Sequence, residues 1–324
     1  MMRPRVYIPD AIHADGLARL GGAFEIDAPA ARDDAATARS FAAADAVIVR
    51  NLGIDAASLD AAPRLKVIAK HGAGVDNIDI PAATERGIVV GSVPGGNADA
   101  VAEATVAMML AVLRRVPDVH RLVTSGRYAE RFNLQFEQLG GRTLGLLGIG
   151  NIGARVARIC AGGFGMKVLA YDPVLQEAAV RDRGAEKVAH LADLLAAADV
   201  VSLHLPLTPA TRHIIGREQL RTMKPTAILI NAARGSLVDE LALADALREG
   251  RIYGAGLDVL EVEPPALGSP ILTAPNVVLS PHTAGNSVEA ARNLAVASAD
   301  IVIDVFAGRK PAAFLNPEVW DRRR

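Results

Sequence analysis

The stretch Leu144-Gly145-Leu146-Leu147-Gly148-Ile149-Gly150-Asn151-Ile152-Gly153 decides the fold. Apolar residues up to Leu147 predict a buried strand, and the pattern at 152–159 predicts a helix directly after the glycines. Gly148 permits a tight turn, Gly150 lets a pyrophosphate approach backbone N–H groups at the helix N-terminus, and Gly153 allows close contact between helix and strand. We therefore predict a dinucleotide-binding turn at Gly148, Gly150, Asn151, Ile152 and Gly153. A plain βα turn is the alternative.

An acidic residue lies at the distance from the glycine-rich turn that is typical of dinucleotide-binding sites. Asp172 ends the next predicted strand, about 20 residues beyond the glycines, where an acidic side chain accepts hydrogen bonds from the adenosine ribose hydroxyls. A carboxylate there repels a 2′-phosphate, and the next three residues bring no basic side chain. We therefore expect NAD rather than NADP. A solvated residue at a strand end is the alternative for Asp172.

Short β-rich runs alternate with Ala- and Leu-rich helical patterns along the whole chain. This alternation favours an α/β fold of two doubly wound parallel-sheet domains. A long apolar helix is expected at 98–115, ended by Pro117 and buried between domains or subunits. A last helix at roughly 287–307 is expected to return to the first domain, so that the domains comprise residues 1–98 with 286–324, and residues 99–285. The predicted strands are 6–8, 24–26, 46–49, 66–69 and 88–90 in the first domain, and 143–147, 167–171, 200–204, 227–231, 256–259 and 277–280 in the second.

Composition argues against several classes of function. The formal net charge is −1 with acidic and basic residues intermixed, so neither nucleic acid nor membrane is an expected partner. The one cysteine, Cys160, cannot form an intramolecular disulfide, and residues 1–5 lead directly into the first strand. We therefore expect no signal peptide and a cytoplasmic location. No metal site is expected, and residues 321–324 are expected to form a solvated tail.

Three complementary side chains each follow an apolar run of the second domain. Arg234, Glu263 and His282 come after the strands at 227–231, 256–259 and 277–280, whose carboxyl ends form the edge where open α/β sheets bind ligands. Histidine suits proton exchange with a carbonyl or alcohol oxygen, a carboxylate orients and stabilises the imidazolium, and a guanidinium clamps a substrate carboxylate. Singly they have bland alternatives: a backbone-bonded histidine, a solvated glutamate and a surface arginine. Together they predict hydride transfer on an acidic carbonyl or alcohol.

Two further elements have open alternatives. Gly72, Ala73 and Gly74 follow the strand at 66–69, and their backbone N–H groups are suited either to binding a carboxylate or only to making a tight loop. Asp258, before Glu263, is expected either to hydrogen-bond the nicotinamide carboxamide or to cap a loop.

With these residues assigned, the chain resembles the D-isomer-specific 2-hydroxyacid dehydrogenase family over nearly its whole length. Several stretches in one order are specific to that family, and they occur here as follows: HGAGVDNID (71–79), AATERGIVV (82–90), PGGNADAVAE (94–103), GRTLGLLGIGNIG (141–153), VVSLHLPLTPATRHII (200–215), INAARGSLVDE (230–240), GLDVLEVEPP (256–265) and SPHTAG (280–285).

The resemblance implies a discontinuous flavodoxin-like substrate domain and a Rossmann NAD-binding domain, with the site in the cleft between them. It places the family's catalytic residues on Arg234, Glu263 and His282, and it implies a homodimer joined through the cofactor domains, which accounts for the apolar helix at 98–115. The further positions assigned to the cofactor are Asp172, His204, Pro206, Ala232, Arg234, Asp258, His282 and Gly285. The positions assigned to substrate are Arg50, Gly72, Ala73, Gly74, Arg234 and His282.

Within the family, residues 94–103 are most similar to the 3-phosphoglycerate dehydrogenase branch, in which an arginine matching Arg50 lies near substrate. The residues after Arg50 depart from that branch, so hydroxypyruvate, glyoxylate or another short 2-keto acid stays open beside a phosphorylated one. The stretch 128–136 is expected to help select the substrate. The chain ends soon after the last helix, so serine feedback through a further domain is not expected. An NAD-sensing, corepressor-like dimer is the alternative function; a formate-type dehydrogenase is disfavoured, because it has glutamine where Glu263 stands.

Overall fold

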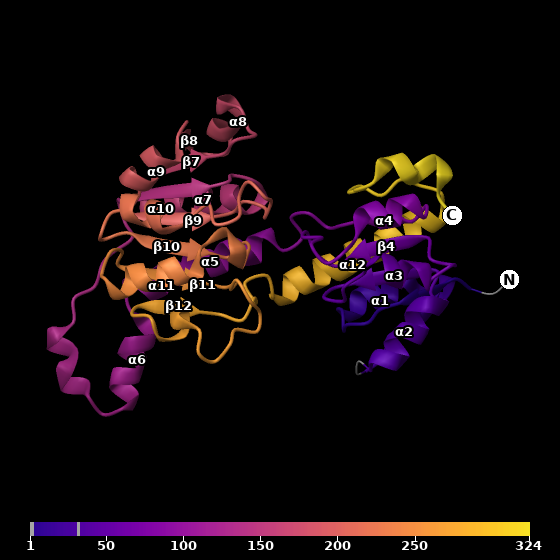
Figure 1. Ribbon diagram of the computed structural model, residues 1–324, viewed down its shortest axis with the longest axis horizontal. Coiled ribbons are helices and arrows are strands. Elements are labelled where there is room, and N and C mark those ends of the chain that lie inside the picture. Colours follow the sequence, from indigo (N-terminus) through magenta and orange to yellow (C-terminus); the bar gives the residue numbers. More distant parts are fainter. Residues whose placement is uncertain (1–2, 31–32) are drawn as a thin grey trace. The chain divides into compact units, whose positions relative to one another are not determined.

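The computed structural model describes residues 3–30 and 33–324, which form two units with a parallel sheet each (Figure 1). Unit 1 comprises the chain up to Asn97 together with Asn286–Arg324, and unit 2 comprises Ala98–Gly285. The prediction of two doubly wound α/β domains is confirmed. Residues 1 and 2 of the predicted lead into the first strand lie outside the described part.

The sheet of unit 1 has the strand order β2-β1-β3-β4-β5 among the described residues. Because neighbouring residues of a strand point to opposite faces, Val6 and Ile48 pack on one face of the sheet and Tyr7 and Val47 on the other. The elements up to Asn97 are β1 (Arg5–Tyr7), α1 (Ala14–Leu20), η1 (Gly21–Ala23), β2 (Glu25–Asp27), α2 (Asp34–Ala43), β3 (Ala46–Val49), α3 (Ala56–Asp60), β4 (Val67–Lys70), α4 (Ile80–Glu85) and β5 (Val89–Gly91).

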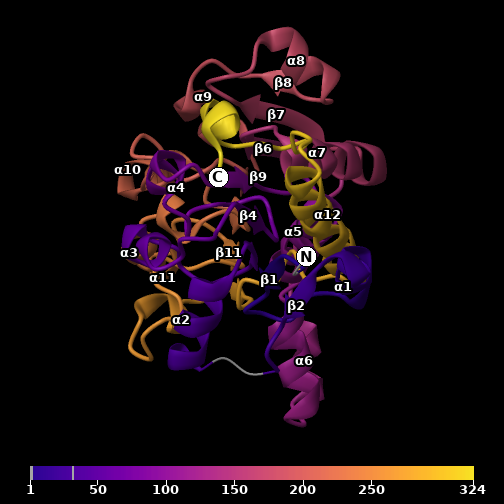
Figure 2. The same ribbon diagram turned by 90° about the vertical axis from the view of Figure 1, so that its right-hand side faces the viewer.

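The last long helix, α12 (Val288–Phe306), belongs to unit 1 although it follows unit 2 in the chain. The hydroxyl of Ser287 caps it by accepting a hydrogen bond from the backbone N–H of Ala290 at 3.0 Å. The helix packs along α1 and β4, and both views show it beside α1 (Figures 1 and 2). A Cβ on Gly16 of α1 would lie only 2.7 Å from that of Ala295, so this close packing requires the glycine.

Asp321, Arg322 and Arg324 are exposed, as expected of a solvated tail, but the tail also makes contacts with the protein. It begins within η5 (Pro317–Arg322), whose Trp320 is buried. The guanidinium of Arg323 lies 4.0 Å from the centre of the Trp320 ring. The guanidinium of Arg324 donates to the carbonyl oxygens of Ala62 and Pro63 at 3.1 and 3.2 Å. Charge alone did not reveal these cation–π and carbonyl partners.

Unit 2 contains a seven-stranded parallel sheet in the order β12-β11-β10-β9-β6-β7-β8, with its switch point between β6 and β9. Helices α9, α10 and α11 pack on one face and α5, α7 and α8 on the other. The strands are β6 (Thr143–Leu147), β7 (Lys167–Tyr171), β8 (Glu186–Lys187), β9 (Val200–Leu203), β10 (Ile228–Asn231), β11 (Gly254–Leu257) and β12 (Val277–Leu279). The helices are α5 (Ala98–Leu113), α6 (Val116–Thr124), η2 (Tyr128–Asn133), α7 (Asn151–Phe164), α8 (Glu177–Asp182), α9 (Leu191–Ala197), α10 (Arg217–Thr222), η3 (Gly235–Leu237), α11 (Glu240–Arg248) and η4 (Pro270–Thr273).

Helix α5 differs from its prediction in where it ends. It stops at Leu113 because Arg115 adopts a left-handed conformation with φ 49°. Pro117 does not end α5 but lies in the first turn of α6, where its missing N–H has no intrahelical acceptor to lose. Met109 and the buried residues 102, 106, 108, 112 and 113 of α5 pack in the core of unit 2, against α7 and the sheet. No helix in residues 3–30 and 33–324 is long and apolar enough to cross a membrane.

Candidate active site

The glycine-rich turn connects β6 to α7. Gly148 has φ 90°, and a Cβ on it would lie 2.8 Å from the carbonyl oxygen of His204. A Cβ on Gly153 would lie 2.5 Å from the carbonyl oxygen of Gly148. The packing of the protein therefore requires glycine at both positions.

Gly150 differs from its two neighbours. No described atom lies within 4 Å of the position that a Cβ would take there, and no side chain caps the N-terminus of α7. Open space thus lies beside the start of a 14-residue helix, and a helix N-terminus is an arrangement that binds a phosphate group. This region fits the pyrophosphate of a dinucleotide, and it is where Asn151 and Ile152 begin the helix.

Asp172 joins the glycine turn to the end of β7. Its Oδ2 accepts a hydrogen bond from the backbone N–H of Ile149 at 3.2 Å, and its Oδ1 accepts from Val174 and Leu175 at 3.0 Å each. Burial alone would raise the pKa of this carboxyl group, but the three donors and the charge of Lys187 outweigh it and lower the pKa below 3.8. Asp172 is therefore an ionised acceptor. Lys187, on β8, is a nearby cation that the sequence around Asp172 did not reveal.

His204 packs against the glycine-rich turn. Its Nε2 lies 3.0 Å from the hydroxyl of Ser202, and burial lowers the pKa of His204 to about 4, so the ring is neutral at physiological pH. Pro206 is exposed in the loop after β9, whereas Ala232 and Gly285 are half-buried in the loops after β10 and β12. All four lie beyond carboxyl ends of strands, and their contacts with the cofactor stay predictions.

Arg234, Glu263 and His282 line one cavity of about 210 Å³ in unit 2. His282 Nδ1 lies 2.8 Å from Glu263 Oε2, and Glu263 Oε1 accepts a hydrogen bond from the backbone N–H of Leu260 at 3.0 Å. With a hydrogen on Nδ1 shared with the carboxylate, Nε2 is the ring atom left for a substrate oxygen. The side chains of His282 and Glu263 are 53% and 39% exposed, which leaves them accessible. The fold thus brings the three predicted catalytic residues together.

The loop that carries His282 is clamped by Asp258. His282 has φ 56°, an unusual conformation for a residue with a side chain, and its N–H donates to the carbonyl oxygen of Asp258 at 2.7 Å. The Asp258 carboxylate accepts from the Ser280 hydroxyl and from the N–H groups of Thr283 and Ala284 at 2.6 to 2.9 Å. Of the two interpretations left open, loop capping is thus observed; a contact with the nicotinamide stays a prediction.

The loop that carries Arg234 is held by two residues that the sequence did not single out. Asn231 is fully buried; its side chain donates to the carbonyl oxygen of Arg234 at 2.9 Å and accepts from the N–H of Ala233 at 3.0 Å. A Cβ on Gly235 would lie 1.9 Å from the carbonyl oxygen of Leu260. The loops of Arg234 and Glu263 therefore touch, backbone against backbone. One indication of a role for Asn231 is present in the sequence: it is a polar residue at the end of the apolar run 228–231.

In unit 1, Arg50 and Lys70 lie at the carboxyl ends of β3 and β4. The ammonium of Lys70 donates to the carbonyl oxygen of Arg50 at 2.6 Å and to Asn77 Oδ1 at 2.7 Å, which ties the two loops together. The guanidinium of Arg50 donates to Asn286 Oδ1 at 2.9 Å. The side chains of Arg50 and Lys70 therefore order the loops at this edge of the sheet.

The loop of Gly72, Ala73 and Gly74 follows directly. The N–H of Gly72 donates to the carbonyl oxygen of Lys70 at 2.9 Å, and Ala73 is exposed. His71, by contrast, is buried, and this burial, with the charges of Arg50 and Lys70, lowers the pKa of His71 to about 4. The N–H of Gly72 is therefore used within the loop, which is the tight-loop interpretation for that residue, and carboxylate binding by the loop stays a prediction.

Comparison with known proteins places this site in a family. The model of the D-isomer specific 2-hydroxyacid dehydrogenase NAD-binding domain matches residues 106–284. The chain is 42% identical to a glyoxylate reductase of Korarchaeum cryptofilum over 98% of its own length and 97% of the relative. It is 38% identical to a D-3-phosphoglycerate dehydrogenase of Methanocaldococcus jannaschii, of which it spans 59%.

A solved structure agrees. The NADPH-dependent glyoxylate/hydroxypyruvate reductase of Sinorhizobium meliloti, in complex with NADP and malonate, has 31% sequence identity and a TM-score of 0.85 over 98% of each chain. Together with the arginine, glutamate and histidine in one cavity, these matches show that the chain belongs to the D-isomer-specific 2-hydroxyacid dehydrogenase family.

Proposed function

We propose that this dehydrogenase transfers a hydride between NAD(H) and C2 of a short, unphosphorylated 2-keto or 2-hydroxy acid of the glyoxylate or hydroxypyruvate kind. The observation that carries the proposal is the His282–Glu263 pair at 2.8 Å in the cavity that Arg234 also lines. A small acid is proposed because the chain is 42% identical to a glyoxylate reductase over 98% of its own length.

Each residue has one task in this proposal. Bound NADH supplies the hydride. Arg234 binds the substrate carboxylate and polarises the adjacent carbonyl group. His282 gives a proton from Nε2 to the carbonyl oxygen during reduction and takes it back during oxidation, while Glu263 stabilises the imidazolium. The loop of Gly72, Ala73 and Gly74 in unit 1 is proposed to add backbone donors to the same carboxylate, from Ala73 and Gly74, because the N–H of Gly72 is bonded to Lys70.

The proposal includes NAD rather than NADP. It is supported by the ionised Asp172, because the negative charge of this carboxylate would repel the 2′-phosphate of NADP. A higher kcat/KM with NADPH than with NADH would contradict this part of the proposal.

A phosphorylated substrate is the second candidate, and Arg50 is the observation that favours it. Its guanidinium lies at the edge of β3, but it is engaged with Asn286 in this structure. An Arg50→Gln variant separates the two candidates by the ratio of kcat/KM for 3-phosphohydroxypyruvate to that for glyoxylate: a large fall in this ratio favours the phosphorylated substrate, and an unchanged ratio favours the first proposal.

The test is steady-state oxidation of NADH with a panel of acids: glyoxylate, hydroxypyruvate, pyruvate, 2-ketobutyrate, phenylpyruvate and 3-phosphohydroxypyruvate. The proposal expects the highest kcat/KM with glyoxylate or hydroxypyruvate. A preference for the phosphorylated acid would overturn it. A folded dimer that binds NADH but turns over none of these acids would favour the corepressor-like alternative.

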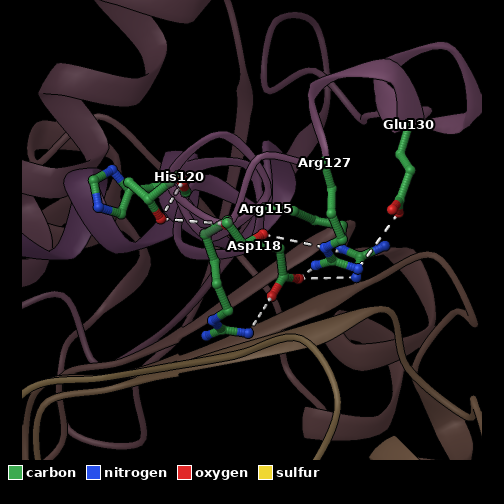
Figure 3. Close-up of polar contacts among 8 residues, drawn as sticks. Arg115, Asp118, His120, Arg127 and Glu130 are labelled. Atoms are coloured by element: carbon green, nitrogen blue, oxygen red, sulfur yellow. Dashed lines mark hydrogen bonds and ion pairs between the residues drawn. The ribbon is translucent and has the colours of Figure 1, made fainter.

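A second copy of the chain is the proposed partner, docked through unit 2. Helices α6 and η2 form an arm, residues 116–133, and α6 stands away from the sheet of unit 2 (Figure 1). The arm exposes large apolar side chains, of which Phe132 is 79% and Tyr128 58% accessible. Asp118 of the arm forms an ion pair with Arg115, which precedes the arm, and Glu130 forms one with Arg127 (Figure 3). Sedimentation of Phe132→Ser, compared with wild type, tests this: a wild-type dimer that the variant dissociates supports it, and a monomeric wild type contradicts it.

The proposal also includes a reducing, cytoplasmic location. Its support is Cys160, the chain's one cysteine, which is buried and free.

A further inference from the structure

A second carboxylate lies two residues before the catalytic glutamate and takes no part in the proton transfer described above. We propose that Glu261 is a positioning residue: through Arg212 and His213 it holds the loop of Glu263 so that Glu263 stays bonded to His282. The inference rests on the proposed function, in that it concerns the same histidine and glutamate.

Glu261 is anchored by two donors from another strand-end loop. Its Oε1 accepts from the guanidinium of Arg212 at 2.9 Å and lies 2.7 Å from His213 Nε2. The Glu261 side chain is 27% exposed, so these contacts are only partly screened by water. His213 is itself fixed, because its backbone has φ 50° and its N–H donates to the carbonyl oxygen of Ser236 at 2.8 Å.

The backbone of the same residue is tied to α11. The N–H of Glu261 donates to Glu240 Oε2 at 3.0 Å, and Glu240 Oε1 accepts from the Ser269 hydroxyl at 2.8 Å. Glu240 thus holds the loop at two points, one on each side of Glu263. Both parts of Glu261 are therefore bound: its side chain by Arg212 and His213, and its backbone N–H by Glu240.

This anchoring reaches the catalytic pair through one residue. Leu260 precedes Glu261, and its N–H is the donor that orients the Glu263 carboxylate at 3.0 Å. Its carbonyl oxygen rests against Gly235, beside Arg234. A loop that moves at Glu261 moves this donor, and with it the carboxylate that bonds His282.

The contacts of Glu261 also reduce the repulsion between nearby carboxylates. Asp258, Glu261 and Glu263 place three carboxylates within one short loop, and Glu240 adds a fourth from α11. Like charges repel, so the loop needs a cation to hold this arrangement. The guanidinium of Arg212 supplies it at Glu261 and leaves Glu263 to pair with the imidazole.

The test compares Glu261→Ala and Glu261→Gln with a matched control, Glu186→Ala. Glu186 forms an ion pair with Lys167 at 2.9 Å, but on β7 and β8, at the opposite end of the sheet from β11. Glu261→Ala is expected to lower kcat about 10- to 100-fold with little change in the KM for NADH. Glu261→Gln is expected to keep most activity, because its amide oxygen still accepts from Arg212 and His213. The control is expected to match wild type.

Two further readouts separate positioning from a merely structural role. If Glu261 acts through Glu263, adding Glu261→Ala to Glu263→Gln lowers kcat by at most about twofold more. By NMR, the hydrogen-bonded Nδ1–H proton of His282 in wild type is expected to broaden or vanish in Glu261→Ala, and this holds whatever the substrate is.

The outcomes overturn different claims. Wild-type kcat and an unchanged His282 signal in Glu261→Ala would refute the positioning role, as would a full multiplicative loss in the double variant. No turnover of any acid by wild type would refute the proposed function, and the NMR comparison would still decide the role of Glu261.

Discussion

Replacing Gly235 with alanine tests how the loops of Arg234 and Glu263 hold each other. The new Cβ would lie 1.9 Å from the carbonyl oxygen of Leu260 and 2.5 Å from the N–H nitrogen of Glu261. Contacts under 3.0 Å essentially do not occur for a Cβ, so the backbone must move by at least 3.0 − 1.9 = 1.1 Å. A misplacement of about 1 Å costs about 100-fold in rate, so Gly235→Ala is expected to lower kcat by about that factor.

The assay is steady-state keto-acid reduction, with thermal unfolding measured in parallel to show that the variant folds. Gly268→Ala is the matched control, because that glycine lies nearby in the chain and no described atom lies within 4 Å of its Cβ position. The control is expected to keep wild-type kcat. A kcat for Gly235→Ala within about twofold of wild type would refute the reasoning, since the two loops would then not depend on this contact.

Three other substitutions probe the cofactor site and its supports. Gly150→Ala is expected to change the unfolding free energy by less than about 1 kcal/mol but to weaken NADH binding, because its methyl group enters only the space left for the pyrophosphate; NADH fluorescence titration measures this. Gly162→Ala, with open space around its Cβ in α7, is expected to raise the unfolding free energy by about 0.5 to 1 kcal/mol in urea denaturation. Asp172 has a lowered pKa, so its ionised form stabilises the fold above the usual carboxyl pKa of 3.8 and this contribution is lost as the pH falls. Asp172→Asn is therefore expected to be destabilised at neutral pH, with a difference from wild type that shrinks in acid.

Much of the fold followed from hydrophobic patterns, and the misses have local causes. The predicted strands at 46–49, 143–147 and 167–171 agree with β3, β6 and β7 at both ends, because each contains at least three consecutive buried residues. β8 was missed because it consists of only Glu186 and Lys187, two charged residues at a sheet edge without any periodicity. The end of α5 was placed too late because a left-handed Arg115 has no signature in the sequence.

Site residues were predicted from the sequence where the chemistry of the reaction requires a particular residue type. Residues whose role depends only on their contacts in the folded protein were missed. Arg234, Glu263 and His282 share a cavity, as three strand ends of one sheet implied. Glu261 had no such signal, since a glutamate in a loop is usually solvated and its partners come from a distant part of the chain. Asp258 had two equal interpretations, and only its three donors from the His282 loop showed that it caps that loop.

The turnover of His282→Ala measures the central claim most directly. The account predicts that kcat for keto-acid reduction falls by about 100- to 10,000-fold while the affinity for NADH stays that of wild type, because the variant lacks only the proton donor. An unchanged kcat would contradict the account, and so would a loss confined to NADH binding.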